Sequence, residues 1–333
     1  MKAAVLHEAG SAVQIEQVPV PELLPGHALV RLEFASLNHR DVWIRKGQYA
    51  GLKFPIVLGS DGSGTVESTA DGEGADWVGK PVIVNPSLGW GGSERAQDLA
   101  SFNILGLPHD GTFAEVVAVP IENLAARPAN LSAQQAATIP LAGLTAYRVL
   151  FSRGQLKPGE QVLVTGAGGG VAAFAVQMAH AAGAKVWVSS GAEQKIEAAK
   201  RLGAVGGVNY RNEDWPRELK SMAGSFDLIV DGAGGAGYRD LTDLAKSGST
   251  IVSYGATAGN VPNFELRRLY WKQLNLLGST MGSPHDFREM VEFLGQHKIE
   301  PVVDCEFALD EANAALDWME GSHQMGKIVL RVG

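Results

Sequence analysis

The sequence predicts an α/β protein of two domains, a β-rich domain and a doubly wound parallel sheet. Three observations predict this fold. The chain has 333 residues, which is more than one hydrophobic core usually supports. Strand patterns dominate residues 1–129, and from residue 130 onward short apolar strands alternate with helices. Such an alternation is typical of a parallel sheet.

The composition is that of an ordinary globular protein, with 45% hydrophobic residues and a formal net charge of −8. This acidity argues against nucleic acid or an anionic membrane as a partner. No apolar run reaches the roughly 18 residues that a membrane span needs, and the N-terminus lacks a signal-peptide core. Cys305 is the only cysteine, which excludes an internal disulfide and a four-cysteine zinc site. A cytoplasmic location is expected.

The β-rich domain is predicted from period-2 patterns. Ala28–Phe34 alternates apolar with mostly polar positions after a Pro25-Gly26 turn signal, as a half-buried strand does. Val82–Val84 and Phe113–Val119 have the composition of further strands. The long polar segment between them, Asn85–Asp110, is expected to be a loop that forms a surface lobe.

The second domain is predicted from the regular alternation that follows a capping box at Ser132–Gln135. The expected strands are Gln161–Thr165, Lys185–Ser189, Phe226–Asp231, Thr250–Tyr254 and Leu274–Leu277. The expected helices are Gly170–Ala182, Gln194–Leu202 and Tyr238–Leu244.

The last residues do not continue this rhythm. They contain an amphipathic helix around Phe287–Leu294, a second helix at Glu311–Met319 and a closing strand at Lys327–Val332. We therefore expect this tail to return to the first domain. The predicted domains are residues 1–129 with 281–333, and residues 130–280.

Two glycine-rich stretches have the composition of phosphate loops. LVTGAGGGVAAF (Leu163–Phe174) lies between a strand and a helix, where glycines and a helix N-terminus bind a pyrophosphate. Its fingerprint is imperfect, and the alternative is a packing turn, but the βαβ context favours dinucleotide binding. The expected contacts are Gly168, Gly169, Gly170 and Val171. IVLGSDGSGTVE (Ile56–Glu67) is followed by a strand pattern, so no helix dipole faces it.

The residues after the next strand indicate which dinucleotide binds. Ser190 stands where an acid would accept hydrogen bonds from the ribose of NAD. Ser189 and Ser190 can donate hydrogen bonds to a 2′-phosphate instead, and Lys195 adds a positive charge, although many such lysines are only solvated helix residues. Tyr210 and Arg211 are further candidates for the adenosine end. The sequence therefore favours NADP(H), and we expect NADPH as the cofactor.

Several motifs in fixed order resemble the medium-chain dehydrogenase/reductase superfamily. They are PLAGLTAY (Pro140–Tyr147), LKPGEQVLVTGAGGGV (Leu156–Val171), AKRLGA (Ala199–Ala204) and GKIVL (Gly326–Leu330). The resemblance covers the full length and implies a GroES-like catalytic domain, made from both chain ends, around a Rossmann domain, with the active site in the cleft. It also implies a homodimer or homotetramer joined through the last Rossmann strand near Leu274–Leu277.

The same resemblance separates zinc-dependent from zinc-free members. Zinc members place a cysteine at the position of Asn38, a His-Glu pair at Ser60-Asp61 and a second cysteine near Leu141. The residues of this chain cannot build a catalytic zinc site of nitrogen and sulfur donors, and its Asn85–Asp110 segment lacks the four structural cysteines. We therefore expect no metal. The residues that could in principle build an unrelated site are His39, Asp41, Asp61 and His109.

What remains resembles the zinc-free, quinone oxidoreductase-like branch. Its N-x-x-D…G-x-Y pattern is matched by Asn38, Asp41 and Tyr49. Such enzymes pass hydride from NADPH to a quinone, an enone or a related electron-poor acceptor. Without a Lewis acid, the acceptor oxygen must be polarised by hydrogen bonds or ordered water, and nothing lowers the pKa of an unactivated alcohol. Reduction is therefore the expected direction.

The expected catalytic residues are Asn38, Asp41, Tyr49, Ser60 and Asp61. Asn38 is expected to orient the substrate or the nicotinamide, unless it only caps a turn. Asp41 is expected to support local structure, paired with Arg40 or Arg45. Tyr49 can donate a hydrogen bond, stack on a flat acceptor or simply pack.

Ser60 and Asp61 are expected to line the cleft, where Asp61 positions water or accepts a structural hydrogen bond. The resemblance adds cofactor contacts at Thr145, Tyr254, Gly255 and Lys327. Two other functions stay open: an NADP-dependent alcohol or aldehyde reductase, and a non-catalytic NADPH-binding protein that recognises a partner. RNA is a poor candidate for that partner because the chain is acidic.

Overall fold

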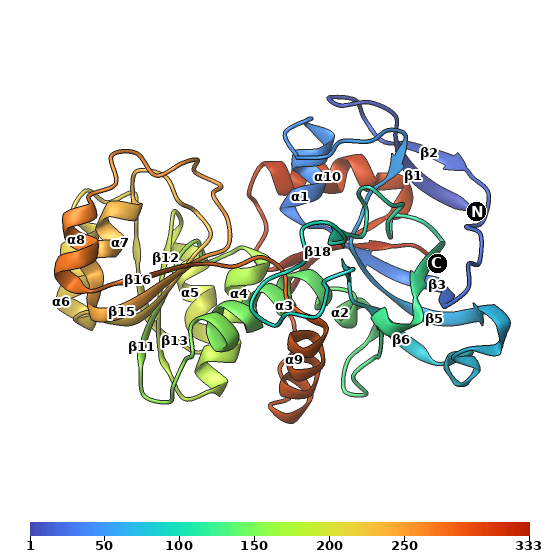
Figure 1. The fold of residues 1–333 in the computed structure, drawn as a ribbon. Helices are drawn as coiled ribbons and strands as arrows, with labels where there is room; N and C mark the ends of the chain where they lie inside the picture. The colour runs from blue at the N-terminus through green and yellow to red at the C-terminus, as the bar shows by residue number, and fades with distance from the viewer. The chain divides into compact units, whose positions relative to one another are not determined.

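The computed structural model describes residues 1–333 apart from the side chain of Asp71, and the chain divides into two compact units (Figure 1). The first unit contains Met1–Ala142 and Ser283–Gly333, and the second contains Gly143–Gly282. The C-terminal tail thus belongs with the N-terminal residues. Residues 130–142, predicted to open the second domain, lie in the first unit, because helix α2 (Ala133–Ala136) packs on strands β3 and β5.

Two antiparallel or mixed sheets form most of the first unit. One has the order β2-β1-β4, and the other β10-β6-β5-β3-β18-β17, with β9 pairing with β3. The strands are β1 (Lys2–Leu6), β2 (Gln14–Gln17), β3 (His27–Ser36), β4 (Ile56–Val57), β5 (Asp61–Thr69), β6 (Pro81–Val84), β9 (Val116–Pro120), β10 (Leu124–Ala126), β17 (Val303–Ala308) and β18 (Lys327–Arg331). Strand β18 pairs antiparallel with β3, so that Val329 lies opposite Ser36. This pairing brings the start of the last strand beside the end of β3.

The stretch Ile56–Glu67 is mostly strand and only briefly a loop. Strand β5 begins at Asp61, leaving residues 58–60 as the connection from β4. A Cβ atom on Gly64 would overlap the carbonyl oxygen of Arg31 on β3. The glycine there therefore allows close approach of two paired strands, which is a packing role.

The first unit also contains helices, of which α9 (Pro284–Gln296) is the longest with 13 residues. They are α1 (His39–Arg45), α2, α9 and α10 (Ala312–Glu320), and α3 (Pro140–Tyr147) crosses into the second unit. Short 3₁₀ turns are η1 (Ala70–Gly72), η2 (Ala75–Trp77), η3 (Ile121–Asn123) and η5 (Leu309–Glu311). Leu316 and Met319 of α10 are buried in the same core cluster as Leu6 and Ile328, which anchors the tail. The expected Asn85–Asp110 loop contains a small hairpin, β7 (Ser87–Leu88) and β8 (Asn103–Ile104).

The second unit is a six-stranded parallel sheet in the order β13-β12-β11-β14-β15-β16. Its strands are β11 (Gln161–Val164), β12 (Lys185–Ser190), β13 (Ala204–Asn209), β14 (Phe226–Asp231), β15 (Ala245–Ser253) and β16 (Asn275–Gly278). Its helices are α4 (Gly170–Ala181), α5 (Glu193–Arg201), α6 (Trp215–Ala223), α7 (Tyr238–Leu244) and α8 (Leu266–Lys272), with a π-helical turn η4 (Arg148–Arg153). The strand order reverses between β11 and β14, which is where such sheets bind ligands.

Strand β13 and helices α6 and α8 of this unit were not predicted. Strand β13 contains Gly206 and Gly207, which weaken a strand pattern. A Cβ atom on Gly207 would lie 2.6 Å from Val188 Cγ2, so that glycine allows β12 and β13 to approach. No helix in the described part of the chain is long and apolar enough to cross a membrane.

Candidate functional site

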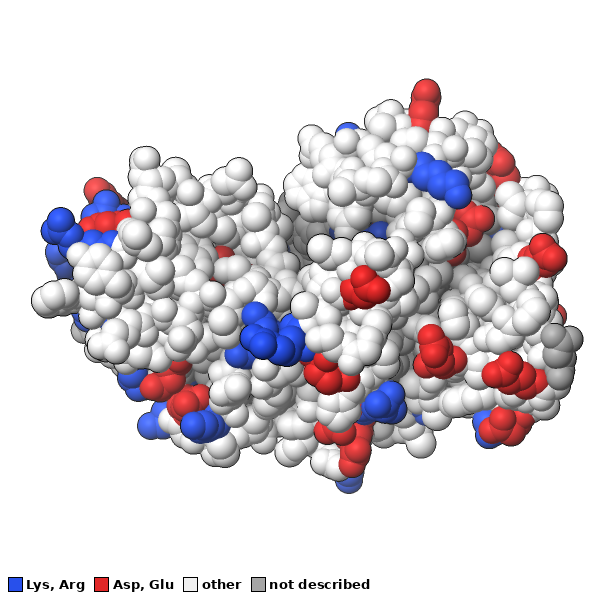
Figure 2. All heavy atoms as spheres, viewed as in Figure 1, with Lys and Arg blue, Asp and Glu red and all other residues white. Residues whose placement is uncertain are grey.

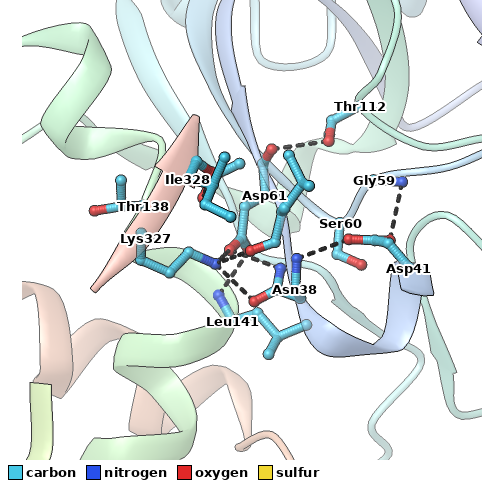
Figure 3. Close-up of polar contacts among 12 residues, drawn as sticks. Asn38, Asp41, Gly59, Ser60, Asp61, Thr112, Thr138, Leu141, Lys327 and Ile328 are labelled. Carbon is cyan, nitrogen blue, oxygen red and sulfur yellow. Dashed lines mark hydrogen bonds and ion pairs between the residues drawn. The ribbon is translucent and has the colours of Figure 1, made fainter. Parts of the chain in front are cut away.

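The first unit contains a buried polar cluster, which we call the Asp61 cluster (Figure 3). It consists of the side chains of Asn38, Asp61 and Lys327 with the backbone of Leu37 and Leu141. Asn38 lies between β3 and α1, Asp61 opens β5, and Lys327 opens β18. Three segments that are far apart in the sequence therefore meet at one point.

The ammonium of Lys327 lies at the centre of the cluster. Its Nζ is 2.6 Å from the carbonyl oxygen of Leu37, 2.7 Å from Asn38 Oδ1 and 2.9 Å from Asp61 Oδ2. Only 3% of the side chain is exposed. An ammonium group has three N–H donors and no acceptor, so three oxygens use all of its hydrogen-bonding capacity.

The carboxylate of Asp61 is fully buried and accepts three hydrogen bonds. Its Oδ1 accepts from the backbone N–H of Leu141 at 2.7 Å, and its Oδ2 accepts from Asn38 Nδ2 and from Lys327, each at 2.9 Å. The hydroxyl of Thr112 donates to the Asp61 carbonyl oxygen at 2.8 Å. Burying a carboxylate is costly unless it is paired and hydrogen-bonded, and here it is both.

The amide of Asn38 has one possible orientation. Lys327 can only donate and the Asp61 carboxylate can only accept, so Oδ1 must face Lys327 and Nδ2 must face Asp61. These two bonds leave the second N–H of Nδ2 unused. Asn38 is also the N-cap of α1 and forms a capping box with Asp41, so the capping alternative holds beside this orientation. The cluster therefore holds an amide donor in a fixed direction.

Ser60 belongs to a neighbouring group. Its Oγ accepts from Arg40 Nη1 at 2.7 Å and donates to the carbonyl oxygen of Leu105 at 2.8 Å. Tyr49 lies over Arg40, with 5.1 Å between the ring centroid and Cζ, which is a cation–π contact. Arg40 was not singled out from the sequence, and the only available signal was its place beside the N-x-x-D pattern.

Asp41 has a structural role at the start of α1. Its Oδ2 accepts from the backbone N–H of Asn38 at 2.8 Å, and its Oδ1 from that of Gly59 at 3.3 Å. Burial raises the pKa of its carboxyl from 3.8 to about 6, and the charge of Arg40 partly opposes this shift. The predicted pairing with Arg45 is wrong, because Arg45 binds Asp317 and Glu320. Arg40 acts on Asp41 through its charge and donates its hydrogen bonds to Ser60 and Leu105.

The donor set of the Asp61 cluster does not fit a zinc ion. One amide, one carboxylate and an ammonium offer neither thiolate nor imidazole, and the ammonium already supplies the positive charge. Among the described side chains, no group of three or more His, Cys, Asp or Glu residues could hold a metal. This also applies to the set His39, Asp41, Asp61 and His109.

The glycine loop of the second unit has the geometry of a pyrophosphate cradle. It follows β11, and its last residue, Gly169, is the N-cap of α4. Gly166 and Gly168 have φ values of +70° and +120°, a backbone conformation that residues with a Cβ atom rarely adopt. The first turn of α4 therefore offers unpaired N–H groups and the positive end of its dipole to an anion. These features fit a dinucleotide.

The residues predicted to select the cofactor lie beside this loop. The Ser190 hydroxyl donates to the carbonyl oxygen of Ala167 at 2.9 Å, so it supports the loop in addition to any contact with ligand. A Cβ atom on Gly168 would lie 2.5 Å from Lys195 Cδ, and one on Gly191 would lie 2.7 Å from the Tyr210 hydroxyl oxygen. The same hypothetical Cβ atom on Gly191 would lie 3.0 Å from Arg211 Nε. Polar and basic groups thus gather where β12 ends.

The other predicted cofactor residues lie on different elements of the two units. Thr145 is buried in α3, while Tyr254 and Gly255 follow β15, and Lys327 lies in the first unit. The Tyr254 ring lies against Gly232, and burial, helped by the charge of Asp231, raises the pKa of its phenol. Asp231 itself accepts from the Thr165 hydroxyl at 2.7 Å and from the Gly234 N–H at 2.9 Å. These contacts order the carboxyl ends of β11 and β14.

Comparisons with known proteins match both units. Residues 24–129 match the alcohol dehydrogenase GroES-like domain, and residues 170–296 match the zinc-binding dehydrogenase family. The zinc-type alcohol dehydrogenase-like protein YogA of Leptosphaeria maculans is 35% identical over 342 residues, covering 96% of this chain and 94% of that protein. Acryloyl-coenzyme A reductase of Sulfurisphaera tokodaii is 26% identical over 339 residues, covering 99% and 100%.

A solved structure confirms the fold over the whole length. The crystal structure of an NAD-dependent alcohol dehydrogenase superposes with a TM-score of 0.94 at 38% identity, covering 100% of both chains. The GroES-like sheets of the first unit and the parallel sheet of the second are the architecture predicted from the sequence. The chain belongs to the medium-chain dehydrogenase/reductase superfamily of oxidoreductases.

Proposed function

We propose that this protein is a zinc-independent, NADPH-dependent oxidoreductase that transfers hydride to a quinone or an α,β-unsaturated carbonyl. The observation that carries the proposal is the Asp61 cluster, in which Asn38 holds a fixed amide N–H beside a cation that the chain itself supplies. When NADPH is bound, its nicotinamide supplies the hydride. The chain supplies hydrogen-bond donors that stabilise the negative charge developing on the acceptor oxygen.

The chemistry of the cluster favours reduction of an activated acceptor. Oxidation of a simple alcohol needs a group that lowers the pKa of its hydroxyl, as zinc does. The Lys327 ammonium cannot serve an alcohol in this way, because its three donors are already bonded to oxygens of Leu37, Asn38 and Asp61. A quinone or enone needs only stabilisation of the oxygen that gains charge. The relative named acryloyl-coenzyme A reductase acts, by its name, on such an unsaturated carbonyl compound.

Alcohol dehydrogenase activity is the second candidate, because relatives and solved neighbours carry that name. The two candidates differ in what they turn over. The first predicts NADPH oxidation with quinones, enals or enones and negligible turnover of simple alcohols with NADP. The second predicts turnover of simple alcohols with NADP. Stoichiometric zinc by elemental analysis would overturn the zinc-independent mechanism. Binding of NADPH without reduction of any acceptor would favour a non-catalytic role.

The preference for NADPH rests on the groups at the end of β12. Ser190 replaces the acid that NAD enzymes use, and Lys195, Tyr210 and Arg211 lie around the glycines there. A 2′-phosphate carries negative charge that such groups bind. The solved neighbour is named NAD-dependent, so dissociation constants of NADPH and NADH must be compared directly. Tighter binding of NADH would overturn this part of the proposal.

We also propose that the protein forms a homodimer or homotetramer in the cytoplasm. Strand β16 is the edge of the parallel sheet, and an uncovered edge favours pairing with a second copy. Helix α8, just before it, exposes Leu266, Tyr270 and Trp271. Figure 2 shows basic and acidic side chains side by side in this region, where Arg268 of α8 pairs with Asp243 and Glu265. The single cysteine, Cys305, is consistent with a reducing compartment.

A further inference from the structure

We propose that the Lys327 ammonium is a built-in cation that takes the place of a metal ion in this site, and that it positions Asn38. The positioning of Asn38 by Lys327 rests on the proposed function, whereas the role of Lys327 as a built-in cation does not. Figure 3 shows the ammonium pointing into the group formed by Asn38, Asp61 and Leu141. These are positions at which the resemblance to zinc-dependent relatives implied metal ligands.

The Lys327 ammonium is surrounded by oxygen atoms. Three oxygens surround Nζ at 2.6 to 2.9 Å: a carbonyl, an amide and a carboxylate. Such oxygens are the ligands that proteins offer to hard cations. An ammonium with its three donors satisfied is a complete occupant of this site, and its charge repels a second cation.

Lys327 also balances the charge of the Asp61 carboxylate. Asp61 is fully buried, and Lys327 is its ion-pair partner at 2.9 Å. The nearby guanidinium of Arg40 donates instead to Ser60 and to the carbonyl oxygen of Leu105. Removing one partner of a buried pair leaves an uncompensated charge. Lys327 is therefore the group that allows a carboxylate to remain at this position.

The backbone at Gly326 and the start of β18 places Lys327 in the cluster. Gly326 has φ +98°, and a Cβ atom there would overlap the carbonyl oxygen of Val302. The N–H of Lys327 donates to that same carbonyl at 2.9 Å, and the N–H of Leu37 donates to Ile328 at 3.0 Å. The Gly-Lys pair at the start of β18 thus has a local explanation. The glycine lets the chain enter the strand, and strand pairing holds the lysine against the end of β3.

The bonding of Lys327 differs from that of a cofactor contact, which is the role that the resemblance implied. As a cofactor contact, Lys327 would need a free N–H to donate to the ligand. All three donors are bonded within the first unit. The acceptor for one of them is Asn38 Oδ1, which fixes the amide so that Nδ2 faces Asp61. Lys327 is thus a positioning residue that acts through Asn38.

The test compares the apoproteins of Lys327→Gln, Asp61→Asn and the double variant. Glutamine keeps hydrogen-bonding groups but removes the charge. We expect Lys327→Gln to lower Tm by roughly 10 °C or more, and the double variant to be more stable than Lys327→Gln alone. The matched control is the exposed pair Lys2–Asp310, which is 3.0 Å long and for which Lys2→Gln should change Tm by about 2 °C or less. An equal loss of Tm in Lys327→Gln and Lys2→Gln would overturn the proposal. A double variant whose loss of Tm is the sum of the two single losses would overturn it as well.

A second measurement asks whether a cation is what the site requires. Lys327→Ala removes the side chain beyond Cβ, which corresponds to propylammonium. We expect propylammonium to raise the Tm of this variant in a saturable way, and 1-propanol, of the same shape but neutral, to leave it unchanged. Wild type should respond to neither. An equal response of the variant to the two additives would contradict the built-in cation.

A third measurement separates the positioning role from a cofactor contact. We expect Lys327→Gln to bind NADPH within about threefold of wild type and to lose kcat through Asn38. A large rise in the NADPH dissociation constant with unchanged apoprotein Tm would assign Lys327 to the cofactor and overturn our inference. The Tm and rescue measurements need no acceptor substrate. They therefore keep their meaning even if the acceptor screen for the proposed function fails.

Discussion

The Asp61 carboxylate and the Lys327 ammonium form a buried ion pair, 2.9 Å long, between residues 266 positions apart. The pair joins the start of β5 to the start of β18. Because it lies inside the first unit, it connects the N-terminal and C-terminal segments of that unit directly. The same bonds orient Asn38, so the stability of the fold and the geometry of the site depend on one contact.

Asp61→Asn should destabilise the protein strongly. The variant leaves the Lys327 charge buried without its counterion, which typically costs about 3–5 kcal/mol. Urea unfolding at neutral pH measures the loss. Asp310→Asn is the matched control, because Asp310 pairs with Lys2 at the surface, where such a pair contributes about 1 kcal/mol or less. A loss of similar size in both variants would show that the buried pair has no special weight.

Asn38→Ala should slow the chemical step and leave cofactor binding unchanged. The variant removes the amide donor that the Asp61 cluster holds in place, and loss of one such donor costs about 100-fold or more in kcat. Steady-state kinetics with an acceptor from the screen, beside NADPH titration, measures both quantities. Asn103→Ala, in the β7–β8 hairpin, serves as the control. If kcat is unchanged, Asn38 does not contact the acceptor.

The fold could be predicted from the sequence to a large extent, because its signals are local. The period of the strand Ala28–Phe34 and the capping box at Ser132 depend only on neighbouring residues. Strand β13 was missed because glycines at 206 and 207 satisfy packing against β12, which the sequence of β13 alone does not reveal. Helix α1 was missed because seven residues give too short a pattern.

The site was predictable in its residue types but not in its bonds. The resemblance singled out Asn38 and Asp61, and the structure joins their side chains by a hydrogen bond. That Lys327 joins them depends on the register of β18 against β3, which is a long-range pairing. The role of Arg40 beside Ser60 depends likewise on the position of β5. Such contacts between distant segments have no periodic signature.

Asp41 should make the stability of the protein depend on pH. Its folded-state pKa of about 6 lies above the ordinary 3.8, so between these values the folded state binds more protons than the unfolded state. The free energy of unfolding therefore falls as pH rises from about 4 to 6, by about 3 kcal/mol from this group. Asp41→Asn should remove this slope. The NH₂ group of the new asparagine would also face the backbone N–H of either Asn38 or Gly59, which then loses its acceptor. Urea unfolding across pH 4 to 7 tests this, and parallel curves for wild type and variant would contradict it.

Lys195→Ala should weaken NADPH binding and spare NADH. The Lys195 side chain lies against Gly168 in the phosphate loop, where its charge can pair with a 2′-phosphate that NADH lacks. We expect the dissociation constant of NADPH to rise by about tenfold or more, which corresponds to about 1.4 kcal/mol. Lys200→Ala is the control from the same helix, since Lys200 pairs with Glu197. A parallel loss of NADH affinity would place Lys195 at the pyrophosphate instead.

Trp271→Asp should dissociate the oligomer. Trp271 is 79% exposed on α8, next to the edge strand β16, and a large exposed aromatic residue beside an open sheet edge is typical of an interface between subunits. A buried charge at that position should convert the dimer or tetramer to monomers, which analytical ultracentrifugation measures directly. Leu99→Asp is the matched control, because Leu99 is 86% exposed in the first unit, outside this region. If Trp271→Asp keeps the mass of the wild-type assembly, this face of α8 does not contribute to the interface, and if wild type is itself a monomer, the proposed assembly is wrong.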